Sequence, residues 1–490
     1  MNPLPPTLLI RPLSVPFHAT VAVPGSKSIT NRVLTLAALS RGSSVLRGAL
    51  WAEDTEVMVD CLQRLGFQVK VRSDPSHGAN RLIEVEGQGG VIPKGGTKSE
   101  PLNLEVATAG TAARFLTAMV CLGRGWYRLD GSARMRQRPV EDLLEALAQM
   151  GVNARSENGN GCFPVLIEAR GLGGGTVEVS GEKSSQFASA LMLVSGCLAA
   201  DMTVKISGKR VSEPFLDLTA ALMSQAMGRE GEKFRRQTGG RECRFEIPAA
   251  GYAARDWRIE PDATAASYPL AMAAILGGQA RVPHLHAGAL QGDIRFWVIL
   301  REFCGRCVLP QPGEECRLDG PWMWAEDRSL YFAPISDTFI TMSVIAPFGQ
   351  APLTMKGLAH TRLQESDRLA AVAGELAKTG VKTEILDDDS LRIHPCHQWR
   401  EAVIDPHNDH RLAMAFAVLG LRDVMGGARP WLRIDNPSCV NKTFPNFFEV
   451  LEEAAAQSQL HAGRPHEPVI LTPEGQPVYP NGHKNAGQTH

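Results

Sequence analysis

The clearest pattern along the chain is a polar turn followed by a helix of small apolar residues. Its first copy is Pro24-Gly25-Ser26-Lys27-Ser28-Ile29-Thr30-Asn31-Arg32, after which Val33–Leu39 continues with apolar residues at helical spacing. The pattern recurs at roughly 70–85-residue intervals, an interval longer than that of solenoid or propeller repeats. Its copies are Pro24–Gly42, Ala107–Gly123, Gly181–Gly196, Pro261–Gly278, Pro334–Gly349 and Pro406–Gly420. We therefore expect six βα-type units whose helices pack together, with polar N-terminal ends available to line a site.

The segment between the first two turns predicts the order of elements within a unit. Val45–Leu50 has the composition of a strand, and Glu53–Leu65 has helical spacing and ends before a glycine. Gln68–Val71 and Leu82–Val85 follow as two further strands. The sequence thus predicts a β-α-β-α-β-β order that is repeated after the later turns.

The length of the chain predicts two large lobes, because 490 residues exceed one ordinary core. The pattern restarts around Asp256–Asp262, so the first lobe is expected at residues 24–257 and the second at residues 1–23 and 258–456. Glu230–Arg244 is charged and is expected to be a loop-like insertion. Residues 457–490 are polar and rich in Pro, Gly and His, which predicts a disordered tail.

Charge and cysteine usage exclude several classes of protein. The 51 Lys and Arg residues balance 52 Asp and Glu, so no global field favours nucleic acid or a membrane surface. No apolar run approaches a membrane span and the N-terminus lacks a signal-peptide pattern, which predicts a soluble cytoplasmic protein. The ten cysteines are scattered, and the cluster Cys304, Cys307 and Cys316 lacks a fourth ligand nearby, so we expect no metal.

The turns themselves carry the candidate chemistry. Hydroxyls, backbone N–H groups and cations at a helix start suit a phosphate or carboxylate. Gly110 in the second turn leaves room for a close ligand, and Ser184-Ser185-Gln186 in the third supplies two hydroxyls and an amide. Ordinary helix capping is the simpler interpretation of each turn alone. Arg134, Arg136 and Arg138 alternate, so they would point to one side if that segment were extended.

Five motifs together identify a family. Pro-Gly-Ser-Lys-Ser, Ser-Ser-Gln-Phe, Gln-Gly-Asp-Ile-Arg-Phe, Asn-Asp-His-Arg and Lys-Thr-Phe-Pro occur in the order found in EPSP synthases, the 3-phosphoshikimate 1-carboxyvinyltransferases of the shikimate pathway. The chain resembles this family from about Leu8 to about Glu453. The resemblance implies a two-lobed α/β fold of six βαβαββ units, three per lobe, with helices packed inside each lobe.

The resemblance also implies the substrates and the residues that bind them. The residues matching the shikimate-3-phosphate contacts are Lys27, Ser28, Arg32, Ser184, Ser185, Gln186, Ser212, Asp337, His360 and Gln364. Those matching the phosphoenolpyruvate contacts are Lys27, Gly110, Arg138, Gln186, Arg368, Arg411 and Lys442. Arginine forks suit both phosphate and carboxylate, and the resemblance implies no metal, no cofactor and a monomer.

Two carboxylates and a lysine carry the expected catalysis. By resemblance, Asp337 takes the 5-hydroxyl proton and Glu365 protonates phosphoenolpyruvate, while Lys27, with Lys442, assists proton transfer. Addition would give a tetrahedral ketal phosphate, and elimination would release phosphate. Each acid also has a simpler interpretation, as an N-cap for Asp337 and as a surface helix acid for Glu365.

Five positions depart from the family pattern. Gln364 replaces a lysine beside the catalytic glutamate and His360 replaces an asparagine. Thr108 replaces asparagine and Phe115 replaces proline in the second turn, and Phe215 replaces a tyrosine near the phosphate-binding serine. Losing one charged hydrogen bond costs ~1.5–3 kcal/mol, so Gln364 bears on the identity of the acceptor more than on the reaction type.

The departures leave two alternatives open. One is enolpyruvyl transfer to a different cyclic alcohol, and the other is a non-catalytic homologue that binds a phosphorylated ligand. The related transferase that acts on UDP-N-acetylglucosamine usually carries an acidic cysteine in the loop of the second unit. Residues Gly131–Pro139 contain no cysteine, which excludes that relative.

Overall fold

The computed structural model describes residues 3–75, 77–239, 242–303, 307–308, 311, 314, 316–320 and 324–479. It divides into two compact units. The middle unit is Pro24–Glu260, and the flanking unit joins Met1–Val23 to Pro261–His490. The candidate cluster Cys304, Cys307 and Cys316 lies partly outside the described residues.

All six sheets of the described structure have four strands with one pairing pattern. The first two strands of each sheet are parallel, and the other two are each antiparallel to their neighbours. Parallel neighbours require a long crossover, which is usually helical, whereas antiparallel neighbours accept a short connection. This is the βαβαββ pattern predicted from the sequence, and the predicted fold class is confirmed.

The middle unit contains three of these sheets. Their strands, in spatial order, are β14 (Asp256–Arg258), β3 (Arg41–Leu50), β5 (Asn80–Gln88) and β4 (Gln68–Ser73); β6 (Leu102–Glu105), β7 (Arg124–Asp130), β9 (Val165–Arg170) and β8 (Asn153–Ser156); and β10 (Gly175–Ser180), β11 (Met202–Ser207), β13 (Glu242–Ile247) and β12 (Arg235–Gly239). Its helices are α1 (Lys27–Leu39), α2 (Glu53–Arg64), α3 (Gly110–Met119), α4 (Glu141–Gln149), α5 (Ser185–Ser195) and α6 (Pro214–Met227).

The flanking unit repeats this arrangement with its own three sheets. Their strands are β2 (Phe17–Thr20), β15 (Gly278–Val282), β17 (Cys316–Gly320) and β16 (Cys307–Val308); β18 (Arg328–Tyr331), β19 (Leu353–Lys356), β21 (Ser390–Ile393) and β20 (Thr383–Asp387); and β22 (Ala402–Ile404), β23 (Leu432–Asp435), β1 (Thr7–Ile10) and β24 (Ile470–Leu471). Its helices are α7 (Ser267–Leu276), α8 (Arg295–Phe303), α9 (Phe339–Ile345), α10 (Arg368–Lys378), α11 (His410–Gly420) and α12 (Phe447–His461).

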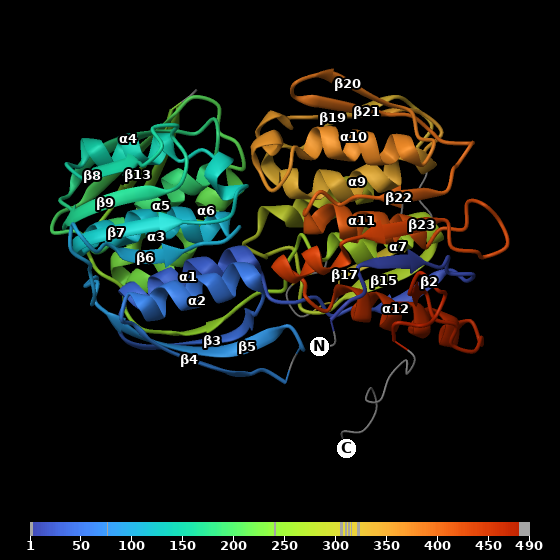
Figure 1. Ribbon diagram of the computed structural model, residues 1–490, viewed down its shortest axis with the longest axis horizontal. Coiled ribbons are helices and arrows are strands. Elements are labelled where there is room, and N and C mark those ends of the chain that lie inside the picture. Colours follow the sequence, from blue (N-terminus) through green and yellow to red (C-terminus); the bar gives the residue numbers. More distant parts are fainter. Residues whose placement is uncertain are drawn as a thin grey trace. The chain divides into compact units, whose positions relative to one another are not determined.

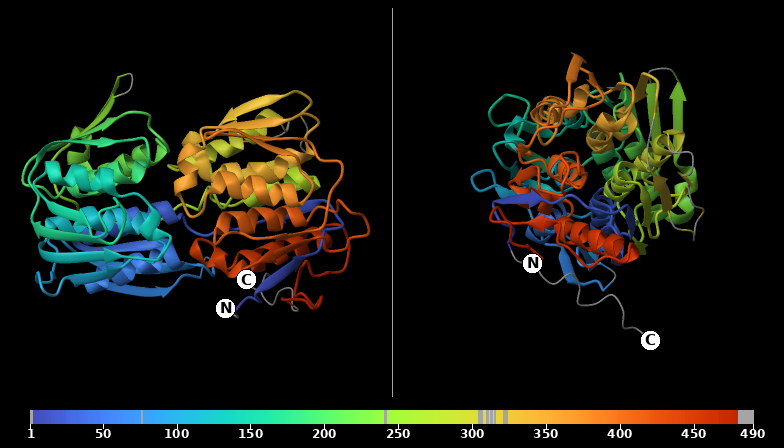
Figure 2. Two further views of the ribbon diagram at one scale, coloured as in Figure 1. Left: turned by 45° about the horizontal axis from the view of Figure 1, so that its top comes forward. Right: turned by 90° about the vertical axis from the view of Figure 1, so that its right-hand side faces the viewer.

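The six helices predicted from the turns form the interior of the two units. Helices α1, α3 and α5 in one unit, and α7, α9 and α11 in the other, are buried on nearly all sides. Helices that are apolar all round belong in a core, and their Ala, Leu and Met side chains allow close packing. Figures 1 and 2 show helices inside each unit with strands on the outside. The inner helices therefore hold their first turns on a rigid base.

The chain crosses between the two units twice, and a strand precedes each crossing. β2 precedes the first crossing but pairs with β15, whereas β14 precedes the second crossing and pairs with β3. Each of these two strands therefore pairs within its own unit, with a partner from a distant part of the chain. In Figure 1, β2 (blue) accordingly lies among the orange and red elements of the flanking unit.

The predicted disordered tail is wrong for the part of it that the structure describes. Helix α12 continues to His461, and β24 pairs with β1 through Leu9 opposite Leu471. The carboxylate of Glu452 in α12 accepts hydrogen bonds from the backbone of Val469 and Ile470, at 3.0 and 2.8 Å. The sixth sheet needs this strand as its fourth member, a requirement that polar composition does not reveal. Residues 480–490 lie outside the described structure.

Residues 230–244 are also more regular than predicted. They contain β12 and the start of β13, which pair antiparallel from Arg235 opposite Glu246 to Gly239 opposite Glu242. The five exposed residues of β12 explain why the segment has the composition of a loop. In the parts of the chain that the structure describes, no helix is long and apolar enough to cross a membrane.

Candidate functional site

In the middle unit, the first turn is held by close backbone contact. A Cβ on Gly25 would lie 1.9 Å from the carbonyl oxygen of Gly48, so only glycine fits there. The Gly25 N–H donates to Asn80 Oδ1 at 2.8 Å, and the Ser26 hydroxyl caps α1 by accepting from the Ile29 N–H. The turn is thus fixed against β3, and the side chains that follow start from a defined position.

Lys27 is the first charged residue of that turn. Its ammonium lies 3.2 Å from the carboxylate of Asp54, a buried residue of α2. The lysine side chain is 13% exposed, so it keeps a small accessible surface. Sequence reasoning missed Asp54. Its only signal was an acidic first turn in the second helix, which is also ordinary helix chemistry.

The second turn brings Gly110 against Arg138. A Cβ on Gly110 would lie 2.6 Å from Arg138 Nη2, so the absence of a side chain lets the guanidinium approach the start of α3. Arg138 Nη1 also donates to the Thr108 carbonyl at 3.4 Å. Gly110 therefore makes room for an arginine, whereas the sequence pattern suggested room for a ligand.

The family resemblance implies phosphoenolpyruvate as a ligand of this turn, and on that expectation we predict that Gly110→Ala raises its KM by about tenfold while the protein stays folded. The new Cβ displaces the Arg138 guanidinium, and loss of one charged contact is worth ~1.5–3 kcal/mol. Steady-state kinetics with each substrate varied measures the effect. Gly374→Ala in α10 is the control, because nothing lies within 4 Å of the position that its Cβ would take. An unchanged KM would show that Arg138 does not need its present position.

The third turn lies next to the second. Ser184 caps α5 by accepting from the Gln186 N–H, and Ser185 is buried at the first helical position. Gln186 Nε2 donates to Thr111 Oγ1 at 3.4 Å, which joins the starts of α5 and α3. Ser212 precedes α6 with φ of +52°, a backbone region unusual for serine. These contacts bring two of the three turns of the middle unit together.

The three alternating arginines do not share one side. Met135–Gln137 forms a short 3-10 helix, so the segment is not extended. Arg136 makes a two-pronged ion pair with Asp130, at 2.9 and 2.8 Å, and Arg134 donates to Gln137 at 3.3 Å. The expectation of a common face is therefore wrong, and Arg138 alone of the three lies at the second turn.

Arg32 is 2% exposed in the middle unit. Its guanidinium donates to Thr219 Oγ1 at 2.8 Å and to the Ser28 carbonyl at 3.0 Å. Burial lowers the pKa of this guanidinium to about 9. The resemblance implies that Arg32 contacts shikimate-3-phosphate, and the structure places its guanidinium among α1, α5 and α6.

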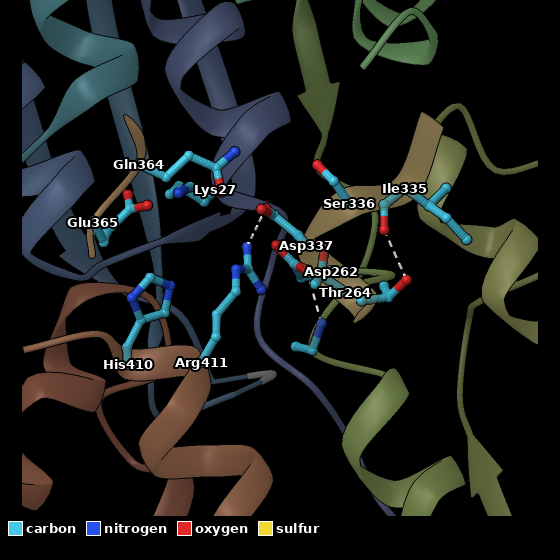
Figure 3. Close-up of polar contacts among 12 residues, drawn as sticks. Lys27, Asp262, Thr264, Ile335, Ser336, Asp337, Gln364, Glu365, His410 and Arg411 are labelled. Atoms are coloured by element: carbon cyan, nitrogen blue, oxygen red, sulfur yellow. Dashed lines mark hydrogen bonds and ion pairs between the residues drawn. The ribbon is translucent and has the colours of Figure 1, made fainter. Parts of the chain in front are cut away.

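In the flanking unit, Asp337 lies between two arginines. Arg368 Nη1 donates to one carboxylate oxygen at 2.7 Å and Arg411 Nη2 donates to the other at 2.6 Å. Figure 3 shows Arg411 reaching Asp337 from the start of α11. Both arginines are buried, while the Asp337 side chain is 21% exposed. A carboxylate that keeps access to solvent beside two fixed cations is a candidate base.

Arg368 is the centre of this cluster. It also pairs with Asp409 at 2.7 Å and with Glu365 at 3.0 Å. Burial favours the neutral guanidine, but the charges of Asp409, Glu365 and Asp337 outweigh it and raise the pKa of Arg368 well above its ordinary value. Sequence reasoning named the Asn-Asp-His-Arg motif but missed the role of Asp409, which caps α11 and neutralises Arg368.

Two departures from the family pattern have partners in this unit. Gln364 Oε1 accepts from Arg368 Nη1 at 2.5 Å, so the amide takes part in the cluster. His360 Nε2 lies 2.8 Å from Ser336 Oγ, beside Asp337 in the chain. Lys442 ends the 3-10 helix Pro437–Lys442, which contacts α11, and it is 3% exposed.

Asp293 belongs to the Gln-Gly-Asp-Ile-Arg-Phe motif, although no role of its own was assigned to it from the sequence. It follows Gln291, whose side chain binds the backbone of Pro261 and Ala263 at 2.8 and 3.0 Å. Asp293 is 3% exposed, and one of its carboxylate oxygens has no hydrogen-bond partner in the described structure. Burial, and then the charge of Asp337, raise the pKa of Asp293 to about 7.

We predict that, because of Asp293, the free energy of unfolding falls as the pH rises from 5 to 8. Because its pKa is raised on folding, the native state binds the proton more tightly, and stability present at low pH is lost as pH rises towards 7. Asp293→Asn should remove about 2–3 kcal/mol of this difference. Urea unfolding at both pH values measures it. Asp388→Asn, at a 97% exposed side chain, is the control, and equal pH dependence in all three proteins would contradict the prediction.

The remaining charged groups of the site are cations at helix starts and the acids that pair with them. Within the residues described by the structure, no group of three or more His, Cys, Asp or Glu side chains could hold a metal ion. The acids around Arg368 share that arginine, and Asp54 faces a lysine. Buried cations at helix starts provide fixed charge for an anionic ligand, which is chemistry that suits phosphoryl and carboxylate groups.

Comparison with known proteins gives one consistent result. The sequence profile of the family described as EPSP synthase (3-phosphoshikimate 1-carboxyvinyltransferase) matches residues 13–451. A relative from Opitutus terrae named 3-phosphoshikimate 1-carboxyvinyltransferase is 40% identical over 453 residues, which cover 92% of this chain and 97% of the relative. One of the same name from Nostoc sp. is 38% identical over 443 residues, covering 90% and 98%. The solved EPSP synthase of Acinetobacter baumannii has the same fold, with a TM-score of 0.69 at 21% identity over 91% of this chain and 98% of that one.

Proposed function

Because the chain belongs to the EPSP synthase (3-phosphoshikimate 1-carboxyvinyltransferase) family, we propose that it transfers an enolpyruvyl group from phosphoenolpyruvate to the 5-hydroxyl of shikimate-3-phosphate. The products are 5-enolpyruvylshikimate-3-phosphate and phosphate. The structural observation that supports this proposal best is Asp337 between Arg368 and Arg411, because it combines a candidate base with two fixed cations. A cytoplasmic location and a monomeric state belong to the same proposal.

The polar turns of the middle unit supply the acceptor-binding residues of the proposal. Ser28, Ser184, Ser185 and Ser212 provide hydroxyls for the phosphate and the ring, and Gln186 adds an amide. Two of these turns are joined by the Gln186–Thr111 contact, which supports a common site. Hydroxyl and backbone donors at helix starts bind phosphate without requiring a metal.

The donor-binding residues include Lys27, Arg138, Arg368, Arg411 and Lys442. The two arginines at Asp337 already direct their N–H groups to a carboxylate. A bound phosphoenolpyruvate would compete for the same donors. Asp337 would then lose part of its cationic stabilisation and become a better base when the donor substrate is present.

The addition step requires two proton transfers. Asp337 accepts the proton of the acceptor hydroxyl while the oxygen of that hydroxyl bonds to C2 of phosphoenolpyruvate. Glu365 delivers a proton to the C3 methylene. The resulting tetrahedral ketal phosphate loses a proton from C3 and expels phosphate, which restores the double bond. Glu365 is held by Arg368 at 3.0 Å, so one arginine positions both acids.

An acceptor panel tests the proposal. Purified protein receives phosphoenolpyruvate with shikimate-3-phosphate, shikimate, or other phosphorylated cyclic alcohols, and the products are identified by mass spectrometry. We expect 5-enolpyruvylshikimate-3-phosphate as the main product. Preferential transfer to another alcohol would identify a different acceptor, and binding of shikimate-3-phosphate with no product from any acceptor would indicate a non-catalytic homologue.

A further inference from the structure

Arg32 differs from Arg368 and Arg411, two other buried arginines of the candidate site, in having no acidic partner. In the described part of the chain, no carboxylate lies within 4.0 Å of its guanidinium. Arg368 and Arg411, by contrast, pair with Asp337, and Arg368 also pairs with Glu365 and Asp409. A buried charge without a counter-charge is costly, so some other feature must hold Arg32 in place.

Two aromatic rings and two hydroxyls enclose the guanidinium. Its Cζ lies 5.2 Å from the ring centroid of Phe115 on α3 and 5.6 Å from that of Phe215 on α6. Nε donates to Thr219 at 2.8 Å and Nη2 donates to Ser189 at 3.3 Å. Helices α3, α5 and α6 all lie beside α1 in Figure 1. We call these four side chains the Arg32 cage.

The cage is held together by its own contacts. Thr219 Oγ1 lies 3.0 Å from Ser189 Oγ and 2.7 Å from the Phe215 carbonyl oxygen, which also accepts from Arg32 Nη2. Guanidinium is weakly hydrated and stacks on aromatic faces, so rings can stabilise it without cancelling its charge. A carboxylate would hold the arginine equally well but would neutralise it.

One N–H group of Arg32 remains beyond the contacts of the cage. A guanidinium has five N–H donors, and the described contacts use four of them. The fifth is on Nη1, the nitrogen that donates to the Ser28 carbonyl at 3.0 Å. The un-neutralised charge therefore lies beside the Ser28 carbonyl of the first polar turn. In the same turn, Lys27 is already paired with Asp54.

We propose that Phe115 and Phe215 are positioning residues that keep Arg32 charged and fixed without a counter-carboxylate, so that its field selects an anionic acceptor at the first turn. Phe115 stands where the family pattern has proline, so the second aromatic face is a departure of this chain. This inference rests on the proposed function and specifies one determinant of acceptor choice.

The test replaces the rings while keeping an apolar side chain of similar size. In the double variant Phe115→Leu/Phe215→Leu we expect the Kd and KM for shikimate-3-phosphate to rise about 5- to 30-fold. The kcat and the KM for phosphoenolpyruvate should change less than about threefold, because the rings face Arg32, which is not one of the groups proposed for proton transfer. The preference for shikimate-3-phosphate over shikimate should fall by a factor similar to the rise in Kd. The single variant Phe215→Tyr keeps the aromatic face, so it should bind shikimate-3-phosphate with a near-normal Kd.

A matched control separates this role from general loss of packing. Phe245 in β13 is fully buried and faces Arg236 at 5.6 Å, but Arg236 pairs with Glu213 and Asp217. Phe245→Leu should lower stability comparably without changing the Kd for shikimate-3-phosphate. Unfolding curves are recorded for every variant.

The outcomes distinguish the inference from the proposed function. Calorimetric binding of shikimate-3-phosphate tests the cage even if the wild-type protein shows no turnover, a result that would overturn only the proposed function. Unchanged Kd in the double variant, or equal weakening by Phe245→Leu, would overturn the inference. So would an equal rise in the KM values of both substrates.

Discussion

Asp337→Asn should lower kcat by about 10³-fold or more while the protein remains folded. Asparagine keeps the size of the side chain but cannot accept a proton, and general-base catalysis contributes about 10²–10⁴-fold. The ion pairs of Asp337 with Arg368 and Arg411 would also be lost. Part of the effect will therefore come from displacement of the Arg368 and Arg411 guanidinium groups, which would also raise the KM for phosphoenolpyruvate.

Asp388→Asn is the matched control for this change, because its side chain is 97% exposed in the same unit. It should leave both kinetic constants unchanged. Glu365→Gln provides an independent comparison: it removes the second proposed proton-transfer group but keeps an amide beside Arg368. Turnover by Asp337→Asn within about tenfold of wild type, with normal circular dichroism, would remove Asp337 from the role of base.

The second large effect is expected at Arg368. Arg368→Met keeps a long flexible chain but leaves Asp337, Glu365 and Asp409 without their shared cation. Removing one partner of a buried ion pair costs about 3–5 kcal/mol, because the remaining charge is uncompensated. We expect an unfolding free energy reduced by that amount and no measurable turnover.

The pH dependence of this variant gives a further check on the cause. Without Arg368, the three carboxylates repel one another with no shared cation between them. Acidic conditions neutralise carboxylates, so the stability deficit should shrink as pH falls from about 8 to about 5. Arg362→Met is the control, since Arg362 is partly exposed and pairs with Asp367, and such pairs contribute at most about 1 kcal/mol. Equal losses in the two variants would contradict the central position of Arg368.

The fold could be predicted because its repeating signal is local. A polar turn followed by an apolar helix is written in consecutive residues, and all six predicted helices exist, from α1 at Lys27 to α11 at His410. The fourth strand of the last sheet could not be found in this way. β24 has two residues, and its pairing with β1 depends on a contact between segments near the two ends of the chain.

Site residues that lie within motifs were easier to name than those that support them. Asp337 and Arg411 belong to polar turns that stand out in the sequence, and the structure joins them at 2.6 Å. Asp54 and Thr219 were missed, and Asp293 was named only as part of a motif, because their partners are distant in sequence and each also fits ordinary helix or turn chemistry. The burial of Arg32 was missed for a related reason, since an arginine near an anion-binding turn is expected to be exposed.

Phosphate release is the most direct test of the central claim that this chain is an enolpyruvyl transferase acting on shikimate-3-phosphate. Purified protein is given phosphoenolpyruvate with and without shikimate-3-phosphate, and inorganic phosphate is followed continuously. We predict release that depends on the acceptor and is lost in Asp337→Asn. Folded protein that binds both substrates but releases no phosphate, or releases it equally without acceptor, would contradict this claim.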